Sequence, residues 1–203
     1  MEYARALRQL KLLEQKGGSM RLAAEGWPKE WQTLISTIMS AQSRDETTIP
    51  IALGLFNRYP SVKELALASY PDVLFLLKSL NYNRTKAKNV ILCAQDLMCD
   101  YNGDVPHDFE KLIALPGVGR KTANVFLSEY GHHGLAVDTH VYQLARALGW
   151  SNANHPHKVE DDLKKLFPKK YWVNINPILV RFGKLHTSRK KKNQLLEQIK
   201  EIN

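Results

Sequence analysis

A glycine-rich turn that leads directly into a helical pattern is the feature that most constrains this chain. Residues 115–124 read Leu-Pro-Gly-Val-Gly-Arg-Lys-Thr-Ala-Asn. Apolar residues with helical spacing precede the turn: Phe109, Leu112, Ile113 and Leu115. A second such set follows it: Ala123, Phe126, Leu127 and Tyr130. The spacing predicts helix, turn and helix, with unpaired backbone N–H groups at the second helix start, where an anion such as phosphate binds.

Other glycine motifs do not fit this turn. No apolar strand precedes it and no third glycine follows, which excludes a dinucleotide-binding fingerprint, and its two glycines are too close together for a Walker loop. By itself a Gly-x-Gly before a helix is often only a tight turn. Between two helices it is a helix-hairpin-helix, a unit that holds nucleic acid by its backbone.

Two residues near the turn are candidates for chemistry. Lys121 falls roughly opposite the apolar stripe of its helix, in the first turn, where the partial positive charge of the helix disfavours a protonated amine. Asp138 lies in Val-Asp-Thr-His at 137–140, where another helix begins. A nucleophilic amine and a carboxylate are thus available. The alternatives are a solvated surface lysine and an aspartate that only caps its helix.

Composition agrees with an acidic partner. The chain has 203 residues, a formal net charge of +9 and 44% hydrophobic residues. Such a basic balance favours a polyanion, although a generic basic protein would share it. We see neither an apolar run of about 18 residues, as a membrane span needs, nor the apolar core of a secretory signal at the N-terminus, and expect an intracellular protein.

The whole chain reads as helical. Periodic apolar residues predict helices around 7–13, 31–39, 55–56, 62–68, 72–80, 87–98, 109–115, 120–130, 141–148, 159–167 and 171–186. No convincing alternating strand or internal repeat occurs. The expected fold class is all-α.

These residues resemble a known family. The turn with residues 137–140 closely resembles the endonuclease III branch of the helix-hairpin-helix (HhH-GPD) DNA glycosylases. Met-Ser-Ala-Gln-Ser-Arg-Asp at Met39–Asp45 is similar to the family's Leu-Ser-Ala-Gln-x-x-Asp segment. Shorter matches follow in the same order: Lys86-Ala87, Tyr101–Pro106 and Arg181–Gly183. The resemblance covers roughly residues 25–186.

The resemblance implies a two-lobed helical fold. One lobe, residues 25–134, would hold six helices and include the hairpin at about 107–131. Both chain ends, 1–24 plus 135–203, would form the other. Duplex DNA that contains a damaged base or an abasic site would lie across the cleft between them, and we expect a monomer.

The resemblance also implies the reaction. A lysine at the position of Lys121 is similar to the bifunctional members, in which the amine attacks the anomeric carbon of the sugar, releases the base and forms a Schiff base. β-Elimination then nicks the strand. Asp138 would stabilise positive charge on the sugar and assist proton transfer. The expected activity is a DNA glycosylase with AP-lyase activity, acting on oxidised pyrimidines. Alternatives are a glycosylase for mismatched or alkylated bases and a non-catalytic DNA-binding protein.

Further residues are expected at the DNA. Gln42 sits four residues after Ile38, on the apolar stripe, so it is either a helix-end residue or a functional one; in the family a glutamine here fills the hole left by a flipped nucleotide. Tyr82 matches a second wedge position, where it would stack on a base, although Asn81 replaces a glycine of that loop. The remaining DNA-binding candidates are Leu115, Gly117, Val118, Gly119, Arg120, Thr139 and His140.

The cysteines depart from the family. Most endonuclease III relatives end with four cysteines that hold an iron–sulfur cluster, which needs thiolate ligands. This sequence has two, Cys93 and Cys99, and Thr187 stands near the first expected position. We expect no iron–sulfur cluster, no metal and no other cofactor. The basic run Arg189–Lys192 would replace part of the lost DNA-contacting surface, or is a solvated tail.

Overall fold

The computed structural model describes residues 3–202, so residues 1, 2 and 203 of the expected second lobe lie outside it. Within the described residues every regular element is a helix, which confirms the all-α fold class. None of these helices is long and apolar enough to cross a membrane. The chain forms two compact units, residues 21–129 and the described parts of 1–20 and 130–203. The expected lobe boundaries lie a few residues further along, after 24 and 134.

Seven described helices make up the unit of residues 21–129. They are α2 (Glu30–Ser40), α3 (Asp45–Arg58), α4 (Val62–Ala66), α5 (Tyr70–Leu76), α6 (Asn83–Tyr101), α7 (Phe109–Ala114) and α8 (Arg120–Glu129). Six were expected. The chain breaks between α4 and α5 because the Ser69 hydroxyl accepts a hydrogen bond from the Asp72 N–H as an N-cap, and Pro71 follows in the first turn.

Helix α2 is the centre of this unit. Every residue from Trp31 to Met39 is buried, and α2 packs against α3, α6 and α8. A helix that is enclosed all round must satisfy its polar side chains internally. Ser36 Oγ therefore donates to the Ala23 carbonyl at 2.6 Å, and Thr37 Oγ1 donates to the Thr33 carbonyl at 2.7 Å. The buried apolar stripe predicted for this helix is confirmed, and its other faces are buried as well.

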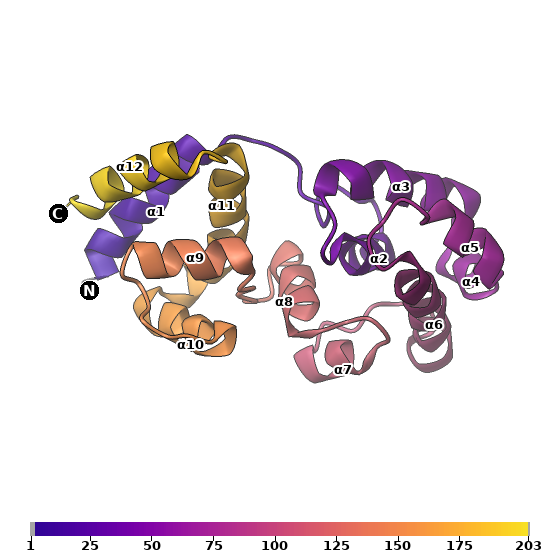
Figure 1. Cartoon of the computed structure of the whole chain (residues 1–203). Coiled ribbons are helices and arrows are strands. Elements are labelled where there is room, and N and C mark those ends of the chain that lie inside the picture. Colours follow the sequence, from indigo (N-terminus) through magenta and orange to yellow (C-terminus); the bar gives the residue numbers. More distant parts are fainter. Residues whose placement is uncertain (1–2, 203) are drawn as a thin grey trace. The chain divides into compact units, whose positions relative to one another are not determined.

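The other unit joins both ends of the chain. Its helices are α1 (Tyr3–Gly17), α9 (Thr139–Ala147), α10 (Pro156–Leu166), a short 3₁₀ turn (Lys169–Tyr171), α11 (Trp172–Leu185) and α12 (Arg189–Lys200). The first and last helices lie side by side (Figure 1), and α1 also packs on α11. A buried glutamine, Gln9, ties them together. Its side chain donates to the Ile199 carbonyl at 3.2 Å and accepts from Trp150 Nε1 at 2.7 Å.

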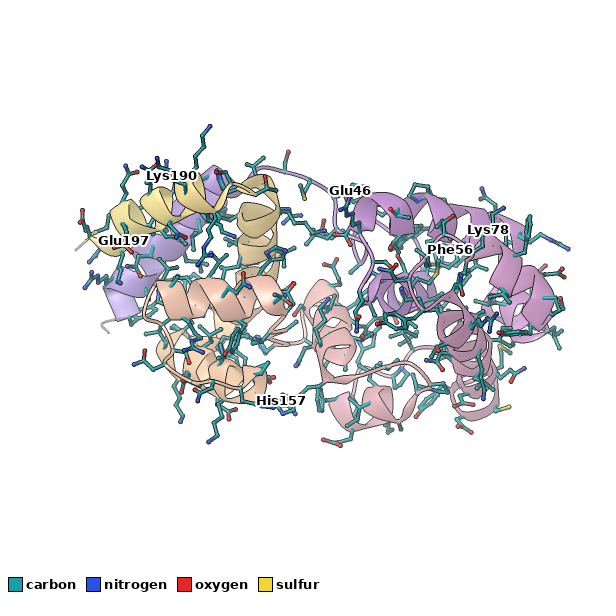
Figure 2. The ribbon with its side chains drawn as sticks, viewed as in Figure 1. Glu46, Phe56, Lys78, His157, Lys190 and Glu197 are labelled. Carbon is teal, nitrogen blue, oxygen red and sulfur yellow. The ribbon has the colours of Figure 1, made fainter. Side chains whose placement is uncertain are left out.

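Helix α12 is an element that the sequence reading missed. The basic run Arg189–Lys192 forms the first turn of this helix rather than a tail. Further along the same helix, Leu196 and Ile199 are buried. These two residues, three apart, were the available signal, but the run of cations obscured it. Lys190 is exposed on this helix (Figure 2).

One lysine of the first unit is buried. Lys86 on α6 keeps only 5% of its surface exposed, and its Nζ donates to Ser43 Oγ at 2.8 Å. Burial penalises the ammonium form and lowers the pKa of Lys86 from 10.5 to about 8. Between these values the unfolded chain binds the proton more tightly than the folded protein does. Stability should therefore rise with pH across that window.

We predict that Lys86→Met removes this rise. The contribution of one lysine has a maximum slope of about 1.4 kcal/mol per pH unit. The measurement is the free energy of unfolding from urea titrations between pH 7.5 and 10.5 (roughly the interval set by the two pKa values). Lys88→Met, at an exposed position of the same helix, is the control and should keep the wild-type slope. Equal slopes in wild type and Lys86→Met would contradict the assignment.

Candidate nucleic-acid interface

The turn between α7 and α8 is built by a Pro-Gly pair. Helix α7 ends at Ala114, and the Val118 N–H donates to the Leu115 carbonyl at 3.1 Å. Gly117 has a φ of +80°, the value that the third position of a type II turn requires, and Pro116 precedes it. The side chains of Leu115 and Val118 are buried. Any contact that these two residues make with DNA would therefore come from their backbone.

The two glycines of the turn have different surroundings. A Cβ at Gly117 would lie 2.9 Å from Asn89 Cβ and 3.1 Å from Ile38 Cγ2, so the fold itself requires glycine there. A Cβ at Gly119 would meet no atom within 4 Å, and its φ is not in the left-handed region. Nothing within the unit explains glycine at 119. A bare backbone at a helix start allows a ligand to approach closely.

Lys121 occupies the second position of α8 and is exposed. The stripe residues Ala123, Phe126 and Leu127 are buried, so the lysine lies off the packed face as the periodicity predicted. The first backbone bond of this helix runs from the Ala123 N–H to the Gly119 carbonyl at 3.0 Å. The N–H groups of Lys121 and Thr122 precede that bond and are left available at the helix start.

Arg120 also begins α8 and is exposed. Its guanidinium carbon lies 5.0 Å from the centre of the Phe109 ring, the first residue of α7. This cation–π contact joins the two hairpin helices and keeps the positive charge beside the turn.

Asp138 is the N-cap of α9. Its Oδ1 accepts a hydrogen bond from the Val141 N–H at 2.9 Å, and the side chain is half-buried. The capping role that the sequence left open is therefore real. A carboxylate has a second oxygen, so capping and charge stabilisation do not exclude each other.

His140 and Thr139 form the first turn of α9. Thr139 is exposed, whereas His140 is half-buried and its ring lies directly over Gly183 of α11. A Cβ at Gly183 would overlap that ring. Glycine at 183, within the matched Arg181–Gly183 segment, therefore allows α11 to approach the start of α9.

Gln42 lies beyond the end of its helix. Placing it on the apolar stripe of α2 was wrong, because α2 ends at Ser40 and Gln42 is exposed with a φ of +53°. The Ser43 N–H donates to the Ser40 carbonyl at 2.9 Å, and Ala41 has φ −53° and ψ 119°. These values describe a type II turn with glutamine where glycine is usual. We call residues 40–43 the glutamine turn.

Tyr82 sits at the tip of a second turn, residues 78–83, which we call the tyrosine turn. Tyr82 has a φ of +56° and is 66% exposed. The Asn83 amide donates to the Lys78 carbonyl at 2.9 Å, and the Asn81 amide donates to the Gln42 carbonyl at 2.6 Å. The two candidate wedge residues thus lie on neighbouring turns linked by Asn81.

Within residues 21–129 the structure brings the candidate DNA-binding elements around α2. The glutamine turn follows α2, the tyrosine turn is bonded to it, and Gly117 lies against Ile38 of α2. Lys121 belongs to this unit, whereas Asp138 belongs to the other. The linking role of Asn81 was not foreseen. An amide beside an exposed tyrosine was the only signal, and its partner is a backbone carbonyl that a sequence pattern does not identify.

Comparisons with known proteins identify the family to which this chain belongs. The model of the HhH-GPD superfamily base excision DNA repair proteins matches residues 35–169. Endonuclease III of Thermotoga maritima is 41% identical over 155 residues, which cover 76% of this chain and 73% of the relative. Endonuclease III of Synechocystis is 39% identical over 155 residues, covering 75% and 71%.

Solved structures give the same result. A trapped endonuclease III–DNA covalent intermediate matches with a TM-score of 0.85 and 28% identity, over 94% of this chain and 90% of that one. A thermostable thymine-DNA glycosylase matches with a TM-score of 0.78 at 17% identity, which shows a shared fold alone. The chain therefore belongs to the HhH-GPD superfamily of base excision DNA repair proteins, as a DNA glycosylase/AP lyase of the endonuclease III type.

Proposed function

We propose that Lys121 is the nucleophile of this enzyme and that its substrate is a damaged base, an oxidised pyrimidine, in duplex DNA. The observation that carries the proposal is an exposed lysine in the first turn of a helix that follows a bare glycine turn. The endonuclease III relative that was trapped as a covalent intermediate with DNA supports a covalent mechanism.

The helix start holds the DNA backbone. The N–H groups of Lys121 and Thr122 precede the first helical hydrogen bond, and Gly119 puts no side chain between them and a phosphate. Arg120 adds a positive charge to the same turn. Such contacts position the strand without reading its sequence, and the damaged nucleotide is rotated out of the stack. Thr139 and His140 approach the DNA from the start of α9.

The chemistry begins when the neutral amine of Lys121 attacks C1′ of the sugar. The glycosidic bond breaks and the base leaves with the bonding electrons and a proton. The sugar ring opens to a Schiff base on Lys121. Removal of the C2′ proton then expels the 3′ phosphate by β-elimination, and water releases the sugar fragment from the lysine. No redox step is involved.

Asp138 has two roles in this proposal. Its Oδ1 caps α9 through the Val141 N–H. Its remaining negative charge stabilises the cationic sugar in the transition state and takes part in proton transfer. Gln42 and Tyr82 enter the duplex where the nucleotide has left the stack. We also propose that the protein acts as a monomer.

The residues of this chain do not fit an iron–sulfur cluster. Its two cysteines both lie on α6, where Cys93 is buried and Cys99 is exposed. Burial and the neighbouring Asp96 raise the pKa of the Cys93 thiol to about 12, which disfavours the thiolate that iron needs. Thr187, near the family's first ligand position, carries no sulfur. The proposed mechanism uses no such group.

We predict that Lys121→Gln abolishes both base release and nicking on duplexes that each contain one lesion. The panel comprises thymine glycol, an alkylated purine, a G·T mismatch and an abasic site. Wild type should release thymine glycol fastest and nick the strand at the same rate. The fold should persist, with a stability change of about 0.5 kcal/mol or less, because the side chain is exposed.

Lys111→Gln is the matched control, since it removes one positive charge from an exposed position of the neighbouring helix α7. It should keep both activities. Persistent nicking of thymine glycol duplexes by Lys121→Gln would assign the nucleophile to another amine. Faster release of the mismatched or alkylated base by wild type would overturn the oxidised-pyrimidine substrate.

We predict that Asp138→Asn separates the two roles of this residue. Asparagine caps helices about as well as aspartate does, so the melting temperature should hold, whereas alanine would cost about 1 kcal/mol. Loss of the charge should slow single-turnover base release about a hundredfold. DNA affinity should hold or increase, because a negative charge is removed. Normal turnover by Asp138→Asn would leave capping as its whole role.

We predict opposite effects for alanine at the two glycines of the hairpin. Gly119→Ala should keep or slightly raise stability, by up to about 1 kcal/mol, because its Cβ meets open space. It should weaken DNA binding in equilibrium titrations, since the methyl group stands where a phosphate approaches. Gly117→Ala should lose about 1–2 kcal/mol of stability to its left-handed φ, and more because its Cβ would lie 2.9 Å from Asn89 Cβ. Unchanged DNA affinity of Gly119→Ala would contradict the proposed phosphate site.

A further inference from the structure

We propose that Asn81 is a positioning residue that couples the glutamine turn to the tyrosine turn, so that Gln42 and Tyr82 enter the DNA as one rigid pair. The inference rests on the proposed function, in which these two side chains act on the duplex. It assigns a role to a side chain that lies outside the hairpin of α7 and α8.

Backbone strain marks both turns. The described residues contain three non-glycine residues with positive φ: Gln42, Tyr82 and Asn102. Asn102 caps the end of α6, an ordinary use of this conformation. Gln42 and Tyr82 lie instead at surface turns, and glutamine and tyrosine rarely adopt this strained conformation. Strained residues that persist are held by their surroundings, and they gather at functional sites.

Both strained side chains are largely exposed. Gln42 is exposed, and Tyr82 is 66% exposed at the tip of its turn. The strain instead directs both side chains to solvent from two neighbouring turns. Side chains presented in this way are suited to enter a base stack.

Three hydrogen bonds hold the turns in this state. The Asn83 amide closes the tyrosine turn on the Lys78 carbonyl, and the Asn81 amide reaches the Gln42 carbonyl itself. Lys86 provides a second tie between the two segments, from Nζ to Ser43 Oγ. Asn81 is therefore bonded to the backbone of the residue whose side chain would fill the duplex.

The chemistry of residue 81 explains the coupling. The family segment that this loop resembles has glycine at this position, and glycine has no side-chain donor. Here the amide nitrogen lies 2.6 Å from the Gln42 carbonyl. A carbonyl held on one side by this bond fixes the peptide plane of the glutamine turn, and with it the direction of the glutamine side chain.

The test compares Asn81→Gly, Asn81→Ala and Asn81→Asp with Asn83→Ala. Asn81→Asp keeps the shape of the side chain but loses the donor, and it covers the case in which glycine or alanine unfolds the loop. Asn83→Ala is the matched control. It removes the side-chain hydrogen bond from Asn83 to the Lys78 carbonyl, which lies within the tyrosine turn and does not reach the glutamine turn. Each variant is first checked by thermal melting.

Two single-turnover rates are then measured, on a duplex with one thymine glycol and on a duplex with a preformed abasic site. Each Asn81 variant should slow base release about fivefold, the range of one hydrogen bond, and change nicking of the abasic duplex less than twofold. The abasic site has no base to extrude and depends less on the pair. Asn83→Ala should change either rate less than the Asn81 variants do.

A double-mutant cycle with Gln42→Gly separates positioning from mere stability. Glycine relaxes the strained turn and removes the glutamine side chain. If Asn81 acts by directing that side chain, Asn81→Ala should slow base release by less than twofold in the Gln42→Gly background. Additive losses in the cycle, or wild-type rates in all three Asn81 variants, would overturn the inference. A wild-type protein inactive on both duplexes would instead overturn the proposed function.

Discussion

The burial of α2 on every side is the constraint on which the surface turns of the candidate DNA interface depend. From Trp31 to Met39 the helix is enclosed by α3, α6 and α8, and its hydroxyl groups bond to backbone carbonyls. Its end cannot move without disturbing that core. The glutamine turn leaves from this fixed end, and the hairpin turn lies against Ile38. One buried helix thereby sets the positions of two surface turns.

The same constraint explains where strain and bare backbone are found. Gly117 is glycine for an internal reason, since a side chain would strike α2 and α6. At Gly119, Gln42 and Tyr82 the packing gives no comparable internal reason for the type of residue. Positions that the fold does not explain are those expected to face a ligand, and here they surround the start of α8 and the end of α2.

Much of the fold was predictable because the apolar residues follow a helical period. The stripe that includes Leu34 and Ile35 and the stripe opposite Lys121 both pointed to their buried faces. Helix α12 was missed because the four cations at its start obscured the apolar signal of Leu196 and Ile199. Gln42 was placed on α2 because it lies four residues after Ile38, as a helical residue would, but its positive φ shows that the helix has already ended. Apolar periodicity depends only on the types of side chain. It cannot reveal a turn in which glutamine adopts a positive φ that is usual for glycine.

The candidate site was predictable to a different degree. The turn, Lys121 and Asp138 could be singled out by spacing, because a helix start and an N-cap have local signatures. The link from Asn81 to the Gln42 carbonyl and the burial of Lys86 could not, since both depend on segments about 40 residues apart that meet only in the folded unit. Long-range contacts to backbone atoms leave no pattern in the chain.

In the proposed mechanism the amine of Lys121, rather than the buried amine of Lys86, carries the covalent step. The most direct measurement is to reduce the enzyme–DNA intermediate with borohydride, digest the adduct and locate the modified residue by mass spectrometry. If Lys121 is the nucleophile, the sugar remnant will be attached to Lys121. A remnant on Lys86, or on any amine other than Lys121, would contradict it.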